Sequence, residues 1–314
     1  LENLGLHRPD LRAWAMYDWG ISSYQTVIMA AVFPIFFSQY AAHGLGESAR
    51  LQWFSYAQTV GAVLIAILAP ILGAVADYKA AKKKFLGAFM ILGVGATSAM
   101  FLIGQGDVLL AAALLILSLA GATGSTTFYE ALLPHIANEK EMDRVSTAGY
   151  ALGYIGGGIL LALNLVVIQN PGLVGLPSGA GLTPEQASLP TRLSFISVGI
   201  WWLLFSIPVL RKVPEPARTI EPDERPDVNA YKVAFSRLGD TLRALRGYKQ
   251  AFLMMVAFTI YNDGIQTIIK MAAAYGDTIG IERKHLITAI LIVQFVGVPC
   301  AFAFGYVAKF VGAK

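Results

Sequence analysis

The chain has 314 residues, of which 56% are hydrophobic and 14% charged, whereas soluble domains carry about 25% charged residues; this composition excludes an ordinary water-soluble globule. The single cysteine excludes a disulfide framework and any cysteine-based metal or iron–sulfur site. The net charge of +4 does not indicate a nucleic-acid partner, because positive charge in a membrane protein gathers in its cytoplasmic loops.

Seven apolar stretches free of charged residues follow one another along the chain, and an eighth apolar segment, residues 251–276, is interrupted only by Asp263 and Lys270. Each is long enough to cross a bilayer, which takes about 20 residues of helix. Because helices pair their own backbone groups and no alternating barrel pattern is present, we expect an all-α, multi-pass membrane protein. The predicted spans are residues 15–40, 52–76, 85–105, 108–131, 146–169, 193–210, 250–275 and 286–308.

One long polar segment divides these spans unevenly. Residues 1–210 form a six-helix N-terminal half, 211–249 a cytoplasmic linker, and 250–314 the start of a C-terminal half that we expect to lack four helices beyond Lys314. The linker begins with a proline-rich stretch and continues with a basic amphipathic stretch, 231–245. This second stretch is either a helix on the membrane surface or a solvated tether.

Lysine and arginine residues fall mainly on one side of this topology. Nineteen of the 24 lie before the first span, in alternate loops, in the linker or after the last span. Since cytoplasmic loops of membrane proteins are enriched in basic residues, the distribution predicts a cytoplasmic N-terminus.

Two short internal sequence similarities predict a repeat. Tyr17-Asp18-Trp19-Gly20-Ile21 in span one resembles Tyr261-Asn262-Asp263-Gly264-Ile265 in span seven, and the turn after span two resembles residues 305–314 after span eight. Both similarities are displaced by six spans. They favour two six-helix halves in the same orientation, related by an axis along the membrane normal.

Asp263 is the sharpest candidate for a functional residue, because we expect it about 20 Å into span seven, near the middle of the hydrocarbon core. An ionisable group there is costly unless it faces a cavity or a partner. Asn262, Asp263 and Gln266 lie on one polar stripe of the helix. The stripe predicts a path for solute or protons; the alternative is hydrogen bonding that only holds helices together.

Four further residues are candidates for the same pathway, each with a structural alternative. Asp18 is either an exposed carboxylate at a helix start or a deeper residue that matches Asn262 in the repeat. Glu130, at the cytoplasmic end of span four, either stabilises packing or handles protons. Tyr24 and Gln25 could line a central path or simply pack between helices.

The turn from Gly73 to Lys84 resembles the signature loop between helices two and three of the major facilitator superfamily. Gly73 and Asp77 match its pattern, but Ala80 stands at the usual second glycine and the positive charge is displaced to Lys82–Lys84. We expect Asp77 and Gly73 to belong to a cytoplasmic gate. The series Gly149, Gly153, Gly157 and Gly158 is similar to the superfamily's antiporter motif and predicts close packing, against span eight, with a link to proton exchange.

Several longer segments are similar to the vacuole-effluxer family, the autophagy-linked vacuolar permeases and their prokaryotic relatives. These segments are residues 13–19, Phe33-Pro34, Phe128-Tyr129, Leu133-Pro134, 149–154 and 261–269. The resemblance implies a major-facilitator-type bundle of twelve helices and, in fungal members, export of amino acids. It also implies the plasma membrane for a prokaryotic protein and the vacuolar membrane for a fungal one.

Together these observations predict a secondary transporter that moves a small polar solute by alternating access, with coupling to protons. The family resemblance implies that the solute is an amino acid moving outward. The alternatives are a non-transporting scaffold or sensor of the same fold, or a channel. We expect no enzyme activity, cofactor, metal or nucleic-acid partner, because the sequence has neither a nucleotide-binding loop nor clustered histidines. The expected partners are the solute and the bilayer, and the sequence does not set the oligomeric state.

Overall fold

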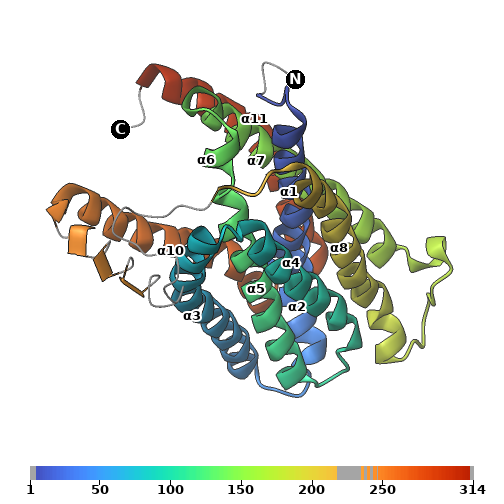
Figure 1. Cartoon of the computed structure of the whole chain (residues 1–314). Helices are drawn as coiled ribbons and strands as arrows, with labels where there is room; N and C mark the ends of the chain where they lie inside the picture. Colours follow the sequence, from blue (N-terminus) through green and yellow to red (C-terminus); the bar gives the residue numbers. More distant parts are fainter. Residues whose placement is uncertain (1–4, 218–234, 237–238, 241–242, 246, 312–314) are drawn as a thin grey trace.

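A computed structural model describes residues 5–217 and 247–311, together with 235–236, 239–240 and 243–245. All regular structure in this part of the chain is helical (Figure 1). Span one runs from Pro9 to Ala41 as α1 (Pro9–Ser23), η2 (Tyr24–Val32), α2 (Phe33–Phe36) and η3 (Phe37–Ala41). The other helices are α3 (Glu47–Lys79), α4 (Lys82–Ala99) with η4 (Met100–Leu102), α5 (Val108–Glu130), α6 (Leu133–Ile136), α7 (Glu139–Gln169), η5 (Pro171–Val174), α8 (Pro184–Lys212), α10 (Lys249–Thr278) and α11 (Arg283–Val311).

The helices coincide with the eight predicted spans and extend beyond most of them at both ends. Within the described residues, seven are long and apolar enough to cross a membrane. The eighth contributes a shorter apolar stretch, Lys284–Cys300. The prediction of an all-α, multi-pass membrane protein is therefore confirmed. Most of the 211–249 linker, including residues 231–234, 237–238 and 241–242 of the predicted amphipathic stretch, lies outside the described residues.

Span one is the centre of the bundle. Its most apolar window is 89% buried, and η2 and η3 are wound as π-helix rather than α-helix. Pro34 lies between these two segments and has no backbone N–H to donate. The side chains of span one that pack against α7 and α8 include Trp14, Tyr17 and Tyr24, all nearly or fully buried.

The helices α4 and α5 approach most closely at two glycines. A Cβ added at Gly121 would overlap the backbone of Gly93 and lie 2.8 Å from the carbonyl oxygen of Phe89. The Trp202 ring of α8 covers Gly93 from the other side, where an added Cβ would lie 2.8 Å from Cζ3. Small residues allow such backbone contact in membrane bundles, where dispersion forces do most of the packing.

Contacts between loops sort the helix ends into two groups. At one end, the Arg8 guanidinium donates to the carbonyl of Ile136, and the Lys83 backbone N–H donates to Glu215 at 3.0 Å. At the other end, the Gly106 N–H donates to the carbonyl of Tyr40 at 3.1 Å. The first end gathers the N-terminus, the α3–α4 turn, the α5–α7 connection and the segment after α8, all of which are the predicted cytoplasmic segments.

The last two helices contact the six-helix bundle differently. Gly297 of α11 packs against the Tyr154 ring of α7, with an added Cβ 3.1 Å from Cε1. In contrast, α10 projects outward from the bundle (Figure 1), and residues 249–269 are exposed except for the half-buried Asn262. Its later turns return to the bundle, where Ala273 and Ala274 are buried.

Candidate functional site

Asp18 lies in the middle of α1 with only 9% of its surface exposed. Among the described residues it is the one charged side chain in the buried core. Ser22, one helical turn later, donates its Oγ hydrogen to Asp18 Oδ1 at 2.9 Å. The alternative of an exposed carboxylate at a helix start is thus wrong, because α1 begins at Pro9 and carries Asp18 well into the bundle.

Aromatic side chains pack on one side of the Asp18 carboxylate. Trp14 stacks on Tyr129 of α5 with ring centroids 4.4 Å apart and planes at 15°, and its indole N–H donates to the Tyr129 carbonyl at 3.0 Å. Tyr17 lies against the same tyrosine at 4.5 Å. These contacts fix α1 against the end of α5 and leave the environment of Asp18 largely apolar.

Glycines of α7 make room for Asp18 on its other side. A Cβ added at Gly153 would overlap Ser22 Oγ and lie 2.9 Å from Asp18 Oδ1, and one at Gly149 would lie 3.6 Å from Asp18 Oδ2. Gly157 likewise faces the backbone of Ser22. The prediction that this series packs against span eight is therefore wrong for three glycines and right only for Gly158, which meets Gln294 and Phe295 of α11. Residues four apart share one helix face, whereas the next residue is turned by about 100°.

Glu130 and Tyr150 border the open side of this group. Glu130 ends α5 directly after Tyr129 and is exposed, and Tyr150 of α7 is 56% exposed. The Trp14–Tyr129 stack joins the helix of Asp18 to the end of α5 that carries Glu130. Two carboxylates from two helices thus share one region, one buried and one reachable from solvent.

The other predicted residues of the first half have different surroundings. Tyr24 is fully buried, and its hydroxyl lies 3.0 Å from Ser118 Oγ, which makes it a packing residue in this state. Gln25 is exposed on η2. Gln58 of α3, which is not among the residues named above, is buried and donates to the Met271 sulfur at 3.6 Å, so it links α3 to α10.

The polar stripe of span seven stands apart from the Asp18 group. Asp263 and Gln266 are exposed on α10, and Asn262 is half-buried. No hydrogen bond, ion pair or ring contact between described residues joins Asp263 to Asp18 or Glu130. In this arrangement the two predicted parts of the pathway are not brought together.

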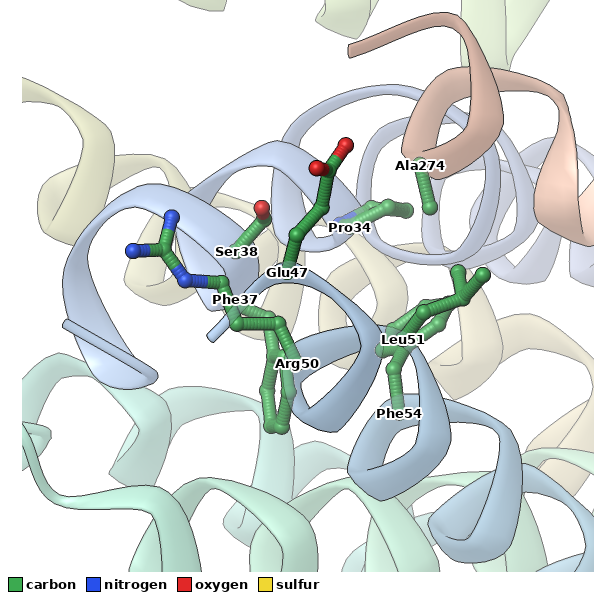
Figure 2. A pocket seen from close by; sticks show the side chains of 8 residues that line it. All are labelled: Pro34, Phe37, Ser38, Glu47, Arg50, Leu51, Phe54 and Ala274. Carbon is green, nitrogen blue, oxygen red and sulfur yellow. The ribbon is translucent and has the colours of Figure 1, made fainter. Parts of the chain in front are cut away.

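A small pocket lies where α10 returns to the bundle (Figure 2). Its volume is about 20 Å³, enough for about one water molecule. Glu47 and Arg50 from α3, Ser38 from η3 and Ala274 from α10 line it with apolar neighbours. Its size does not suit a solute, so it marks a closed contact between the halves rather than a binding site.

The predicted gate residues lie at the α3–α4 turn. Asp77 Oδ1 forms an ion pair with Lys82 Nζ at 2.8 Å, and the same Nζ lies 2.8 Å from His135 Nε2 of α6. Ala80 ends α3 in the left-handed region, with φ 49°. A Cβ added at Gly73 would meet open space, so no described neighbour requires glycine there.

Several residues of these groups were missed by sequence reasoning. Ser22 could have been found from its spacing of four residues after Asp18 on a helix. Tyr129, His135 and Glu215 could not, because their importance depends on contacts with residues far away in the chain. Among the described residues no group of three or more histidine, cysteine or acidic side chains could hold a metal ion.

Comparisons with known proteins give the family. The family model described as "Vacuole effluxer Atg22 like" matches residues 52–314. The MFS-type transporter YxiO of Bacillus subtilis is 34% identical over 298 residues, which cover 95% of this chain and 67% of the relative. Autophagy-related protein 22-1 of Aspergillus niger is 26% identical over 170 residues, which cover 53% of this chain and 26% of that protein.

Solved structures agree on the fold. The partially occluded inward-open form of the xylose transporter XylE from E. coli matches with a TM-score of 0.62 and 14% identity, over 98% of this chain and 74% of that one. Its inward-open form matches with a TM-score of 0.57. The chain is therefore a multi-pass membrane protein of the major-facilitator fold and belongs to the vacuole-effluxer, Atg22-like family of transporters.

Proposed function

We propose that this protein is a secondary active transporter that exchanges a small polar solute for protons by alternating access. The family and the fold support a transport function. Proton coupling is supported mainly by the buried carboxylate of Asp18. A carboxylate in the interior of a membrane bundle is costly unless it is paired, and such groups mark ion or proton pathways. Asp18 has one hydrogen bond, from Ser22, and no ion pair with a described basic residue.

In this proposal Asp18 takes up and releases the coupling proton. Coupling requires that the protonation of Asp18 shift the balance between forms that open to opposite sides. The surroundings favour such a shift, because α7 approaches Asp18 through Gly149 and Gly153 without intervening side chains. A small rotation of α1 against α7 would change the solvation of the carboxylate directly.

The second half supplies the solute contacts. Asp263 binds solute or a second proton, and Asn262 and Gln266 orient the solute once α10 closes against span one. Gln25 lines the same passage, whereas Tyr24 holds span one in register through Ser118. Following the family resemblance, the solute is an amino acid moving outward.

Asp77 belongs to the gate at the end that we assign to the cytoplasm. Its ion pair with Lys82, extended to His135, ties the α3–α4 turn to α6 in this state. Movement of the second half toward this turn would exchange these contacts for others. Gly73 leaves space beside Asp77 for such a partner.

Flux through liposomes tests the proposal. Full-length protein is reconstituted with an equimolar mixture of amino acids and a trapped pH dye, and solute loss and lumenal pH are followed together. We expect saturable solute efflux with matching proton entry, and we expect Asp18→Asn to lose the proton movement. Asp107→Asn, an exposed loop change, is the matched control and should keep both fluxes.

The other outcomes separate the competing functions. Flux that does not saturate indicates a channel, and the absence of flux for every solute indicates a scaffold or sensor. Proton-coupled flux that persists in Asp18→Asn, with an unchanged melting temperature, would remove Asp18 from the mechanism. Asp263→Asn should weaken solute efflux, and normal saturation in that variant would remove the solute role of Asp263.

A further inference from the structure

The region between α1, α5 and α7 carries negative charge without a basic partner. Asp18 lies on α1 and Glu130 at the end of α5, two helices that the Trp14–Tyr129 stack holds together. Neither carboxylate takes part in the ion pairs that His7, Arg8, Lys82, Arg243 and His285 form. Arg8, directly before α1, forms an ion pair with Asp10 at 3.4 Å. Two like charges that share a low-dielectric region repel unless a proton or a cation lies between them.

A second observation points to a ligand at the same place. The Tyr129 side chain is 3% exposed, and its hydroxyl has no hydrogen-bond partner among the described residues. The Tyr129 ring stacks on Trp14 at 4.4 Å and lies 4.5 Å from the ring of Tyr17, the residue before Asp18, which places it where α5 meets α1. A buried hydroxyl without a partner is rare in folded proteins, because it forfeits hydrogen bonds that it makes in water.

The side chains around Asp18 and Glu130 favour a positively charged ligand. The Tyr150 ring, which is 56% exposed, offers an aromatic face, and such faces attract cations and repel anions. Glu130 and Tyr150 are the exposed residues of this region. An ammonium group entering there would meet the Glu130 carboxylate first and the Tyr129 hydroxyl and Asp18 behind it.

We propose that the Asp18–Glu130–Tyr129 group binds the ammonium group of a cationic solute, such as a diamine or a basic amino acid, in exchange for a proton. This inference rests on the proposed function and names the solute class of its first-half site. With one proton shared by the two carboxylates, the pair carries a single negative charge. Binding of a monovalent cation with release of that proton leaves the charge of the site unchanged, so proton and cation exclude each other.

Calorimetry on the full-length protein in nanodiscs tests the exchange without requiring transport. The probes are putrescine and lysine as cations, leucine as a neutral solute and glutamate as an anion, each titrated in two buffers of different ionisation enthalpy. We expect the cations to bind at least tenfold more tightly than leucine, with release of up to one proton per ammonium group bound. Lowering the pH should weaken cation binding, because protons occupy the same carboxylates.

Variants assign the binding to this group. Glu130→Gln should weaken cation binding at least tenfold and remove most of the proton release, whereas Glu185→Gln at the opposite end should change neither. Tyr129→Phe removes only the hydroxyl and should weaken binding severalfold with an unchanged melting temperature. That variant keeps the test decisive if Glu130→Gln proves unstable.

Three results would overturn the inference. These are equal affinity for leucine and the cations, no binding of either cation, and cation binding that both Glu130→Gln and Tyr129→Phe leave intact. Proton-coupled efflux of a neutral solute from liposomes, together with any of them, would reject the cation class and retain the proposed transporter. Loss of all flux would reject the transporter itself.

Discussion

Asp18 and Asp263 show how differently two carboxylates of one membrane protein can be placed. Asp18 is 9% exposed and receives a hydrogen bond from Ser22, whereas Asp263 is exposed on α10. An isolated charge at the bilayer centre costs a few kcal/mol even on insertion scales. Each carboxylate therefore needs a polar neighbour in the membrane, and Asp18 already has one within the described bundle.

The left-handed residue at the end of α3 gives a prediction about stability. Ala80 has φ 49°, a conformation that costs an L-residue roughly 1–2 kcal/mol and glycine almost nothing. Ala80→Gly should stabilise the protein by about 0.5–1 kcal/mol, after subtraction of the extra freedom that glycine gives the unfolded chain. The melting temperature in detergent measures this gain.

The neighbouring residue is the matched control. Ala81 has φ −130°, which requires no glycine, so Ala81→Gly should leave the melting temperature unchanged or lower it. A lower melting temperature for Ala80→Gly would mean that the turn relaxes away from the left-handed conformation in the membrane.

Among the elements, the contact between α4 and α5 depends on a pair of glycines. A Cβ at Gly121 would overlap the backbone of Gly93, which has no rotamer to change. Gly121→Ala should therefore force α4 and α5 apart, at a cost of about 1–3 kcal/mol or more for overpacking. We expect a lower melting temperature and a lower yield of monodisperse protein.

Gly95→Ala on α4 provides the control for this substitution, because its added Cβ would meet nothing within 4 Å. It should be neutral or slightly stabilising, since alanine favours helix by about 1 kcal/mol over glycine. Similar melting temperatures for Gly121→Ala and Gly95→Ala would show that the α4–α5 contact is looser than this structure has it.

The elements also show what the sequence could predict. The positions of the spans followed from unbroken apolar segments, because the bilayer fixes the length that a helix must have. The winding of η2 and η3 did not, since it depends on how span one fits between α7, α8, α10 and α11. The partner of the Gly149–Gly157 face was also missed, because spacing within a helix defines a face and not its neighbour.

For the site, sequence reasoning found the residue types but not their grouping. Asp18 and Glu130 were both candidates, yet only the fold shows that their helices meet where Tyr129 packs against Trp14 and Tyr17. Asp263 could be identified from the sequence alone, because it is a charged residue within an apolar segment. The burial of Asp18 could not be predicted from the sequence, since it depends on glycines of α7, which lie far away in the chain.

At the scale of the whole molecule, α10 meets α3 near one end of the bundle, while α11 packs against α7 at Gly158 and Tyr154. Gln58 contacts Met271, and Ala274 closes the small pocket beside Glu47 and Arg50 (Figure 2). The exposed stretch 249–269 of α10 belongs to the part of the second half that stands away from span one. Alternating access would need these contacts to open while contacts at the Asp77 end form.

Sidedness in the membrane is the last prediction. The end that carries Lys82, Lys83 and Lys84 holds most of the basic loop residues, so the positive-inside rule places it in the cytoplasm. In a Cys300→Ser background, which has no other cysteine, Lys84→Cys and Glu185→Cys introduce single thiols at exposed positions of opposite ends. A membrane-impermeant maleimide should label the Glu185→Cys thiol in intact bacterial spheroplasts and the Lys84→Cys thiol only after permeabilisation.

The parent Cys300→Ser protein should stay unlabelled throughout, which controls for non-specific reaction. Labelling of the Lys84→Cys thiol in intact spheroplasts would invert the topology and place Asp77 and its partners Lys82 and His135 outside the cell. The gate would then face the medium, and so would Glu130, which lies at the same end as the Arg8–Ile136 contact. A cation would in that case be taken up from the medium rather than exported, because the Asp18 group would meet external solute in the present state.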